Sequence, residues 1–162
     1  MRTILFFTFV VALLLQMGCS KDPNRPVDLP KLYSVSIVVT QEGKPLEGAT
    51  VTLISKTPAK YGTCSAETNT SGIAVLRTYG YKGTPAGEYT VTIEKRGVEG
   101  ARETKNEYGD TIMVGGKIYQ YVDGQYADKA SSPFSLNVTE KETKEAFEVG
   151  KPVRIYWGDM AG

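Results

Sequence analysis

The sequence predicts an all-β protein, an antiparallel β-sandwich of about seven strands, on three observations. Apolar and polar residues alternate with a period of two in several segments, as they do when successive side chains point to opposite faces of a sheet. Turn residues, glycine above all, separate these segments. No stretch shows the apolar spacing of a convincing helix, and short strands joined by glycine-rich turns are typical of a sandwich.

The expected strands follow one another along the chain. They are 33–40, 50–53, 73–75, 89–94 and 134–139, with 147–149 and 153–157 supplying the closing strand or strands. The charged segment 140–148 has opposite charges four residues apart, which would support a helical turn. Because it is too short for a stable isolated helix, we expect a charged hairpin there, with a solvated turn between strands.

The segment 1–18 predicts an export signal that precedes the fold. Arg2 supplies a short positive region, and residues 4–15 are apolar except for Thr8. As a helix this run spans about 18 Å, too little for a hydrocarbon core of about 30 Å, so it is typical of a secretory signal peptide.

A small residue, Gly18, stands immediately before Cys19 at the end of the apolar run. This arrangement resembles the lipobox of bacterial lipoproteins, although Gln16 stands where that family prefers leucine. The resemblance implies cleavage before Cys19 and acylation of its thiol, and several acyl chains hold a protein firmly on a membrane. Ser20 after the cysteine favours the outer membrane of a Gram-negative bacterial cell envelope. The alternative is an unmodified cysteine near an ordinary cleavage site.

Residues 19–30 predict a tether, because three prolines in a stretch with few apolar side chains favour extended polyproline II geometry. The sandwich domain is expected over 31–162. The formal charge of the whole chain is +1, and its surplus cation, Arg2, belongs to the signal, so the exported domain is formally neutral. Without clustered positive charge, no nucleic-acid partner is expected.

The chain contains no histidine, which excludes Ser-His-Asp and Cys-His nucleophiles, histidine zinc sites and imidazole pH switches. No cofactor or metal is expected, because the acidic residues around Asp123 lack the spacing of a calcium loop. With Cys19 acylated, Cys64 has no partner for a disulfide within the chain. A lone thiol in an exported protein is usually a buried small hydrophobe rather than a reactive group.

Three motifs in order carry a resemblance to a known family: Gly43-Lys-Pro-Leu-Glu-Gly-Ala-Thr-Val51, Thr68-Asn-Thr-Ser-Gly72 and Pro85-Ala-Gly-Glu-Tyr-Thr-Val91. They resemble the carboxypeptidase regulatory-like family, and the stretch 126–136 is similar to one in small bacterial lipoproteins with this domain. The resemblance implies an Ig-like or transthyretin-like sandwich and a non-catalytic module.

Each motif also has a mechanical interpretation. Gly48 and Gly72 are expected in backbone conformations that favour glycine, and Tyr89 in the core. Asn69 replaces the family's usual aspartate and is expected to cap its turn through a side-chain hydrogen bond.

The segment 96–130 departs from the pattern, because connections within a sandwich usually have about two to six residues and long loops commonly carry binding. The candidate ligand contacts are Tyr108, Tyr119, Tyr121, Tyr126, Asp123 and Asp128. Aromatic rings beside carboxylates are common on carbohydrate-binding surfaces, and tyrosine is also favoured in protein interfaces. In the alternative, the tyrosines fold onto the sandwich, and a small hairpin of apolar residues turns at Gly115-Gly116.

Together these features predict an envelope lipoprotein whose single sandwich binds a glycan or another envelope protein, without enzymatic activity. Two alternatives stay open: a structural spacer of the cell envelope, and a carboxylate-dependent hydrolase, which needs only two acids at a set separation. A shared exposed face of Tyr119, Tyr121 and Tyr126 would favour a sugar platform. Burial of the three rings against the sandwich would remove that interpretation.

Overall fold

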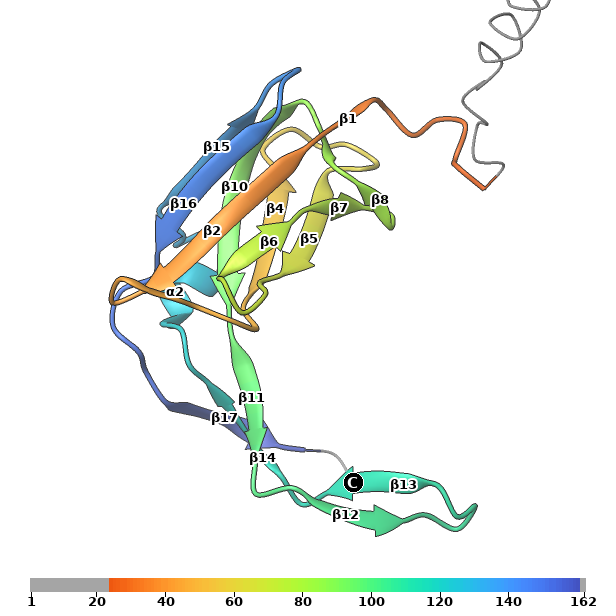
Figure 1. The fold of residues 1–162 in the computed structure, drawn as a ribbon, viewed down its shortest axis with the longest axis vertical. Helices are drawn as coiled ribbons and strands as arrows, with labels where there is room; N and C mark the ends of the chain where they lie inside the picture. Colours follow the sequence, from red (N-terminus) through yellow and green to blue (C-terminus); the bar gives the residue numbers. More distant parts are fainter. Residues whose placement is uncertain (1–23, 161–162) are drawn as a thin grey trace, which may run out of the picture.

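The computed structural model describes residues 24–160, so the predicted signal peptide and Cys19 lie outside the described part. Within this range nearly all regular structure is β, which confirms the predicted class; the helix found there, α2, covers only Gly124–Ala127. None of the described residues form a helix long and apolar enough to cross a bilayer. Two sheets pack against each other, and an arm of further strands projects from one end (Figure 1).

The larger sheet has the strand order β15-β10-β4-β5-β7-β8, with every neighbouring pair antiparallel. Its strands are β4 (Thr50–Ser55), β5 (Thr63–Glu67), β7 (Arg77–Thr78), β8 (Tyr81–Lys82), β10 (Gly87–Glu94) and β15 (Phe134–Val138). The sequence pattern does not predict β5, whose inward members, Cys64 and Ala66, are small.

The smaller sheet is built around β2 (Val35–Gln41). β3 (Lys44–Pro45) and β6 (Ile73–Val75) pair with it antiparallel, whereas β16 (Thr143–Glu148) pairs with it in parallel. This parallel pair departs from the expected antiparallel arrangement. A short pairing of β1 (Leu32–Tyr33) with β9 (Thr84–Pro85) lies at the end of the sandwich away from the arm (Figure 1).

The charged segment 140–148 contains a turn and a strand, as predicted, but it forms no hairpin. β15 and β16 are consecutive in the chain, yet β15 pairs with β10 in the larger sheet and β16 with β2 in the smaller one. The turn therefore crosses between sheets. Phe134 of β15 and Phe147 of β16 contact each other with ring centres 4.7 Å apart, which packs the two edge strands together.

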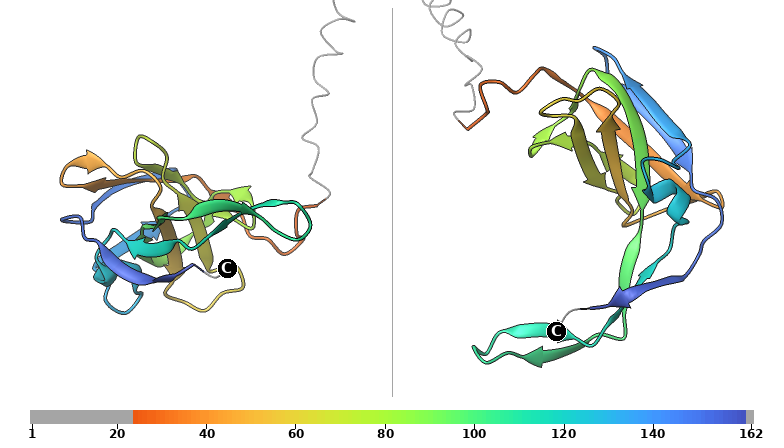
Figure 2. Two further views of the ribbon diagram at one scale, coloured as in Figure 1. Left: turned by 90° about the horizontal axis from the view of Figure 1, so that it is seen from below. Right: turned by 180° about the vertical axis from the view of Figure 1, so that it is seen from behind.

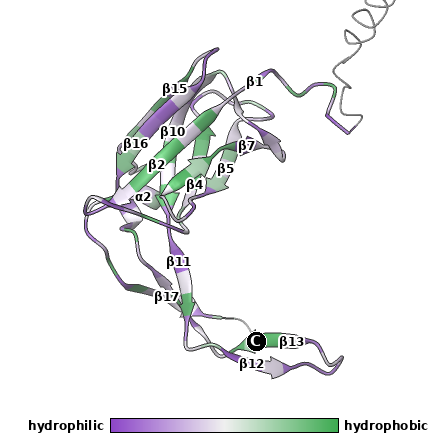
Figure 3. Ribbon diagram, viewed as in Figure 1, coloured by the Kyte–Doolittle hydropathy of each residue, from purple (hydrophilic) through white to green (hydrophobic). Residues whose placement is uncertain are grey.

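The core lies between the sheets and follows the predicted alternation. Figure 3 shows the hydrophobic character of β2 and β4, and the fully buried side chains include Val35, Ile37, Val39, Val51, Leu53, Val91 and Ile93. Tyr89 is buried as predicted, and so is Cys64, which is a free thiol that accepts a hydrogen bond from the Thr78 hydroxyl at 3.1 Å. Both cysteine and tyrosine act as packing residues here.

The turn residues behave as the motifs predict. Gly48 and Gly72 have φ angles of 67° and 73°, in the left-handed region that favours glycine. The Asn69 side-chain oxygen accepts hydrogen bonds from the amides of Ser71 and Ile73 at 2.9 and 3.0 Å, so it caps the turn as expected.

The last residues of the predicted tether already contact the sandwich. Leu29 is 7% exposed, whereas Val27 is fully exposed. The Asp28 carboxylate forms an ion pair with Lys60 and accepts a hydrogen bond from the Tyr61 hydroxyl at 2.6 Å. The Arg25 guanidinium also lies over the ring of Tyr81 in β8, 5.5 Å from the ring centre. Contact with the sandwich therefore begins before the predicted start of the domain at residue 31.

Candidate functional site

The arm is built from the predicted insertion together with the C-terminal strand (Figures 1 and 2). A three-stranded sheet has the order β11-β14-β17, from β11 (Arg96–Glu99), β14 (Lys117–Gln120) and β17 (Ile155–Asp159). A hairpin of β12 (Arg102–Lys105) and β13 (Thr111–Val114) continues beyond it. The prediction that 153–157 closes the sandwich is wrong in this respect, because β17 pairs with β14 in the arm.

The hairpin of the insertion does not turn at Gly115-Gly116, which corrects that expectation. β12 and β13 pair with each other, and the chain turns through 106–110, where the Asn106 side chain accepts hydrogen bonds from the amides of Tyr108 and Asp110 at 3.0 and 2.9 Å. The two glycines instead join β13 to β14, where the arm changes direction (Figure 2). A Cβ atom on Gly116 would lie 2.4 Å from Val98 Cγ1, so the bend needs a glycine there.

One face of the three-stranded sheet carries a linked polar and aromatic cluster. The guanidinium of Arg154 lies over the Tyr119 ring and donates to both carboxylate oxygens of Glu99, at 3.2 Å from Nε and 2.6 Å from Nη2. The Tyr121 hydroxyl donates to Glu99 Oε1 at 2.6 Å, and Tyr156 contacts Tyr119 edge-on. The polar groups of this face therefore satisfy one another.

The electrostatics of this cluster follow from the same contacts. The Arg154 guanidinium, with help from the Tyr121 hydroxyl, lowers the pKa of Glu99 to about 2, so the carboxylate is ionised at any physiological pH. Glu99 in turn raises the pKa of the Tyr121 hydroxyl, which stays a hydrogen-bond donor. Neither group has the pKa near neutrality that proton transfer at neutral pH favours.

The other face of the same sheet is apolar and exposed. The Arg96 guanidinium lies 4.1 Å from the ring centre of Trp157, so these two side chains are on the same face of the sheet. Because side chains alternate along β11 and β17, Val98 and Ile155 lie on that face too. Trp157 is 56% exposed, and the other two are about half exposed. Of the nine large apolar side chains exposed within residues 24–160, six belong to the arm: Val98, Tyr108, Met113, Ile155, Tyr156 and Trp157.

The six residues predicted as ligand contacts do not form one surface. Tyr119 and Tyr121 lie together in the polar cluster, and Tyr108 is exposed at the hairpin turn. Tyr126, in α2, stacks on Phe134 with ring centres 5.3 Å apart and packs against the core.

The two predicted carboxylates have local roles. Asp123 caps α2 by accepting from the amide of Gln125 at 3.0 Å, and Asp128 accepts from the amide of Ala130 at 3.0 Å. The candidate list also missed Glu99, Arg154, Tyr156 and Trp157. The alternating large side chains in 153–157, which include the last three of these residues, predict a closing strand of the sandwich rather than a strand of the arm, and Glu99 has no comparable sequence signal.

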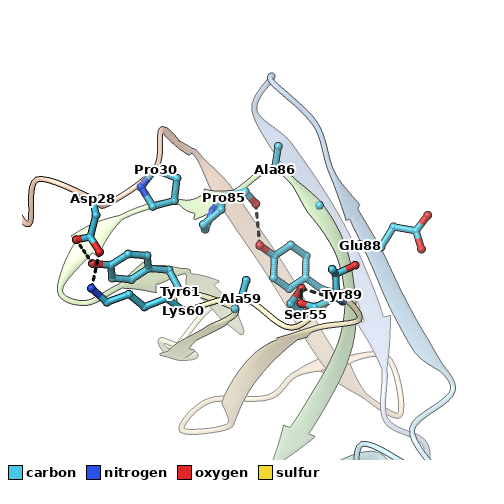
Figure 4. A pocket seen from close by; sticks show the side chains of 13 residues that line it. Asp28, Pro30, Ser55, Ala59, Lys60, Tyr61, Pro85, Ala86, Glu88 and Tyr89 are labelled. Atoms are coloured by element: carbon cyan, nitrogen blue, oxygen red, sulfur yellow. Dashed lines mark hydrogen bonds and ion pairs between the residues drawn. The ribbon is translucent and has the colours of Figure 1, made fainter.

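A groove of about 460 Å³ lies at the other end of the sandwich, between the N-terminal segment and the segments 55–62 and 85–89 (Figure 4). Its polar groups are mostly paired, Asp28 with Lys60 and Tyr61, and the Tyr89 hydroxyl with the Pro85 carbonyl at 2.9 Å. Burial raises the pKa of Tyr89 to about 12. The described residues 24–160 contain no group of three or more Asp, Glu or Cys side chains placed to hold a metal ion.

The fold and the arm define an all-β sandwich with a projecting, partly apolar β-arm. No protein-family model matches this chain, and no curated protein matches it either. The resemblance to carboxypeptidase regulatory-like domains therefore stays a prediction that rests on the three motifs.

Proposed function

We propose that this chain is a lipid-anchored lipoprotein of the bacterial envelope and that its sandwich is a non-enzymatic binding module. The arm contacts another envelope protein. The observation that carries this proposal is the gathering of exposed apolar side chains on the arm, where Trp157, Ile155 and Val98 share one face. Exposed apolar groups that gather in one place are characteristic of interaction surfaces, whereas singly scattered ones are ordinary.

The composition of the arm favours a protein partner over a glycan. A sugar platform needs a free aromatic face, but Arg154 covers Tyr119, and Tyr126 stacks within the sandwich. The side chains that are exposed instead mix Trp157 and Tyr156 with aliphatic neighbours and with Met113. Tryptophan, tyrosine and methionine are enriched in protein interfaces.

The position of the N-terminal segment supports the anchored geometry. The described chain begins at Asn24, at the end of the sandwich opposite the arm (Figure 1). An extended tether from Cys19 to Asn24 would span roughly 16 Å at about 3.1 Å per residue. A lipid on Cys19 would then hold this end towards the membrane, which the Ser20 preference makes the outer membrane of a Gram-negative cell, and the arm would face away from it.

The binding proposal is tested by affinity capture from envelope extract with the full-length chain. Trp157→Ala removes an exposed aromatic ring from the arm, and Tyr79→Ala is the matched control, because Tyr79 is 68% exposed on the sandwich. We expect proteins that the wild type and Tyr79→Ala retain and Trp157→Ala loses. If the wild type and both variants retain the same proteins, the arm interface is refuted. If the chain retains glycans and no protein, the result favours the sugar-binding alternative. Retention of nothing would favour the spacer.

The anchor is tested separately by cell fractionation. Cys19→Ala removes the thiol that lipidation requires, so we expect the variant to leave the membrane fraction. Unchanged fractionation would refute the anchor and leave the arm interface untouched. Hydrolysis of envelope glycan or peptide by the purified chain would instead favour the carboxylate-dependent hydrolase.

A further inference from the structure

The outer hairpin of the arm is a two-stranded ribbon without further support. Within the described residues β12 and β13 pair only with each other, and every side chain from Arg102 to Lys105 is exposed. An isolated two-stranded hairpin is marginally stable in water, and additional strands stabilise it.

The two free edges of this hairpin differ in charge. β12 reads Arg-Glu-Thr-Lys, whereas β13 reads Thr-Ile-Met-Val and carries no charge. Natural proteins protect free edges with lysine, proline or very short strands. β3 has Lys44 and Pro45, β8 has Lys82 and β16 has Lys144, so these free edges are protected. The edge of β13, like the free edges of β15 and β17, carries no lysine or proline.

The backbone of β13 presents hydrogen-bonding groups along that edge. The Asn106 amide donates to the Asp110 carbonyl at 3.0 Å, which makes this opposed pair hydrogen-bonded. Along an antiparallel ladder, hydrogen-bonded pairs alternate with non-hydrogen-bonded pairs, in which the N–H and C=O groups of each residue point away from the partner strand. By the register of the hairpin, Glu103 and Met113 form a non-hydrogen-bonded pair. The N–H and C=O groups of Met113 therefore point outward from the free edge of β13.

We propose that β13 pairs antiparallel with β13 of a second copy of this chain, with Met113 opposite Met113 on the two-fold axis. The result is a four-stranded sheet in the order β12-β13-β13-β12. In this register Ile112 of each copy lies opposite Val114 of the other, and branched apolar pairs of this kind stabilise a sheet.

The sequence of β13 argues for a second copy rather than another protein. A two-fold interface must be complementary to itself, and an uncharged strand meets its own copy without like-charge repulsion. In a shifted register with Ile112 on the two-fold axis, Asp110 of one copy would lie opposite Val114 of the other. That register is less favourable, because it places a charged group opposite an apolar one. This inference goes beyond the proposed function and requires neither the lipid anchor nor an envelope partner.

The first experiment measures the mass of the purified full-length chain in detergent by light scattering and sedimentation. Met113→Lys would oppose two lysines on the axis, while Thr104→Lys adds the same charge to β12. We expect dimers for the wild type and Thr104→Lys, and a dissociation constant at least tenfold higher for Met113→Lys, with unchanged circular dichroism. A monomeric wild type, or equal weakening by both variants, would overturn the proposal.

The second experiment tests the register by oxidative cross-linking. In a hydrogen-bonded antiparallel pair the Cα atoms are about 5.5 Å apart, within disulfide range, so Met113→Cys should link two copies. Glu103→Cys is the control, because three strand spacings would separate its two copies by roughly 14 Å. The wild type measures any background from Cys19 and Cys64. Equal linking of both variants would exclude this register. Pairing of β13 with another envelope protein instead would refute self-association and leave the proposed arm interface standing.

Discussion

The guanidinium carbon of Arg154 lies 3.8 Å from the centre of the Tyr119 ring. Arg154 precedes β17, and Tyr119 belongs to the middle strand of the arm, β14. Because the same guanidinium also binds Glu99 of β11, one side chain links all three strands of this sheet. The polar face of the arm therefore supports the exposed apolar face behind it by linking the three strands.

Arg154→Lys should loosen this support. Lysine keeps the charge but loses the planar fork that binds a carboxylate at two points and stacks on a ring. Because an exposed ion pair contributes little to stability, we expect hydrogen exchange of the amides in β14 and β17 to accelerate only modestly, up to about fivefold, with no change in β4 and β10. Arg102→Lys in the hairpin is the control. The same acceleration in both variants would contradict a specific link.

The pH dependence of the arm should follow Glu99. Its pKa is lowered from 4.5 to about 2 in the folded chain, so the link with Arg154 is complete above pH 4.5 and is lost as the pH falls towards 2. Carboxyl chemical shifts measured by NMR should show Glu99 still ionised at pH 3.5. In Arg154→Lys the midpoint should move upward. A Glu99 midpoint near 4.5 in the wild type would show that the ion pair is not maintained in solution.

Gly72→Ala should destabilise the fold more than Gly43→Ala. Both glycines have a φ near 72°, at 73° and 72°, but a Cβ on Gly72 would lie 2.5 Å from the Val39 carbonyl oxygen, while Gly43 has open space around it. We expect a loss of about 1 kcal/mol for Gly43→Ala from backbone strain alone, and about 3 kcal/mol for Gly72→Ala, where overpacking adds to it. Urea unfolding measures both, and equal losses would refute the steric argument.

Leu29→Ala should reveal whether the end of the tether belongs to the fold. Leu29 is 7% exposed and Val27, two residues earlier, is fully exposed. We expect Leu29→Ala to lower the free energy of unfolding by about 2 kcal/mol, because it leaves a cavity at a peripheral site. Val27→Ala should stay within about 0.5 kcal/mol of the wild type. An unchanged stability of Leu29→Ala would place the start of the folded domain after residue 30.

The strands of the sandwich were largely predictable because their local pattern and their final environment agree. In β2, β4 and β10 every second side chain is apolar, and these are the side chains that the two sheets bury. β5 was missed because Cys64 and Ala66 give a weak apolar signal. The parallel pairing of β16 with β2 was not predictable either, since the pattern of a strand says which face is apolar but not which neighbour it has.

The candidate site was predicted only in outline. The excess length of 96–130 indicated an unusual element, but Gly115-Gly116 indicated the wrong place for its turn. The side chain of Asn106 organises the actual turn, while Gly116 packs beneath Val98. Arg154 could not be assigned to Glu99, because the two residues meet only through strand pairing between distant segments.

By itself the sequence determined the β class, the buried face of the main strands and the glycine and asparagine turns, because alternation, backbone freedom and side-chain capping act within a few residues. Only the tertiary structure decided that β17 leaves the sandwich for the arm and that Tyr126 packs on the core while Tyr119 joins the polar cluster. It also decided that β13 pairs, among residues 24–160, with β12 alone. These features depend on which distant strands pair, and that choice follows from the whole core rather than from any single segment.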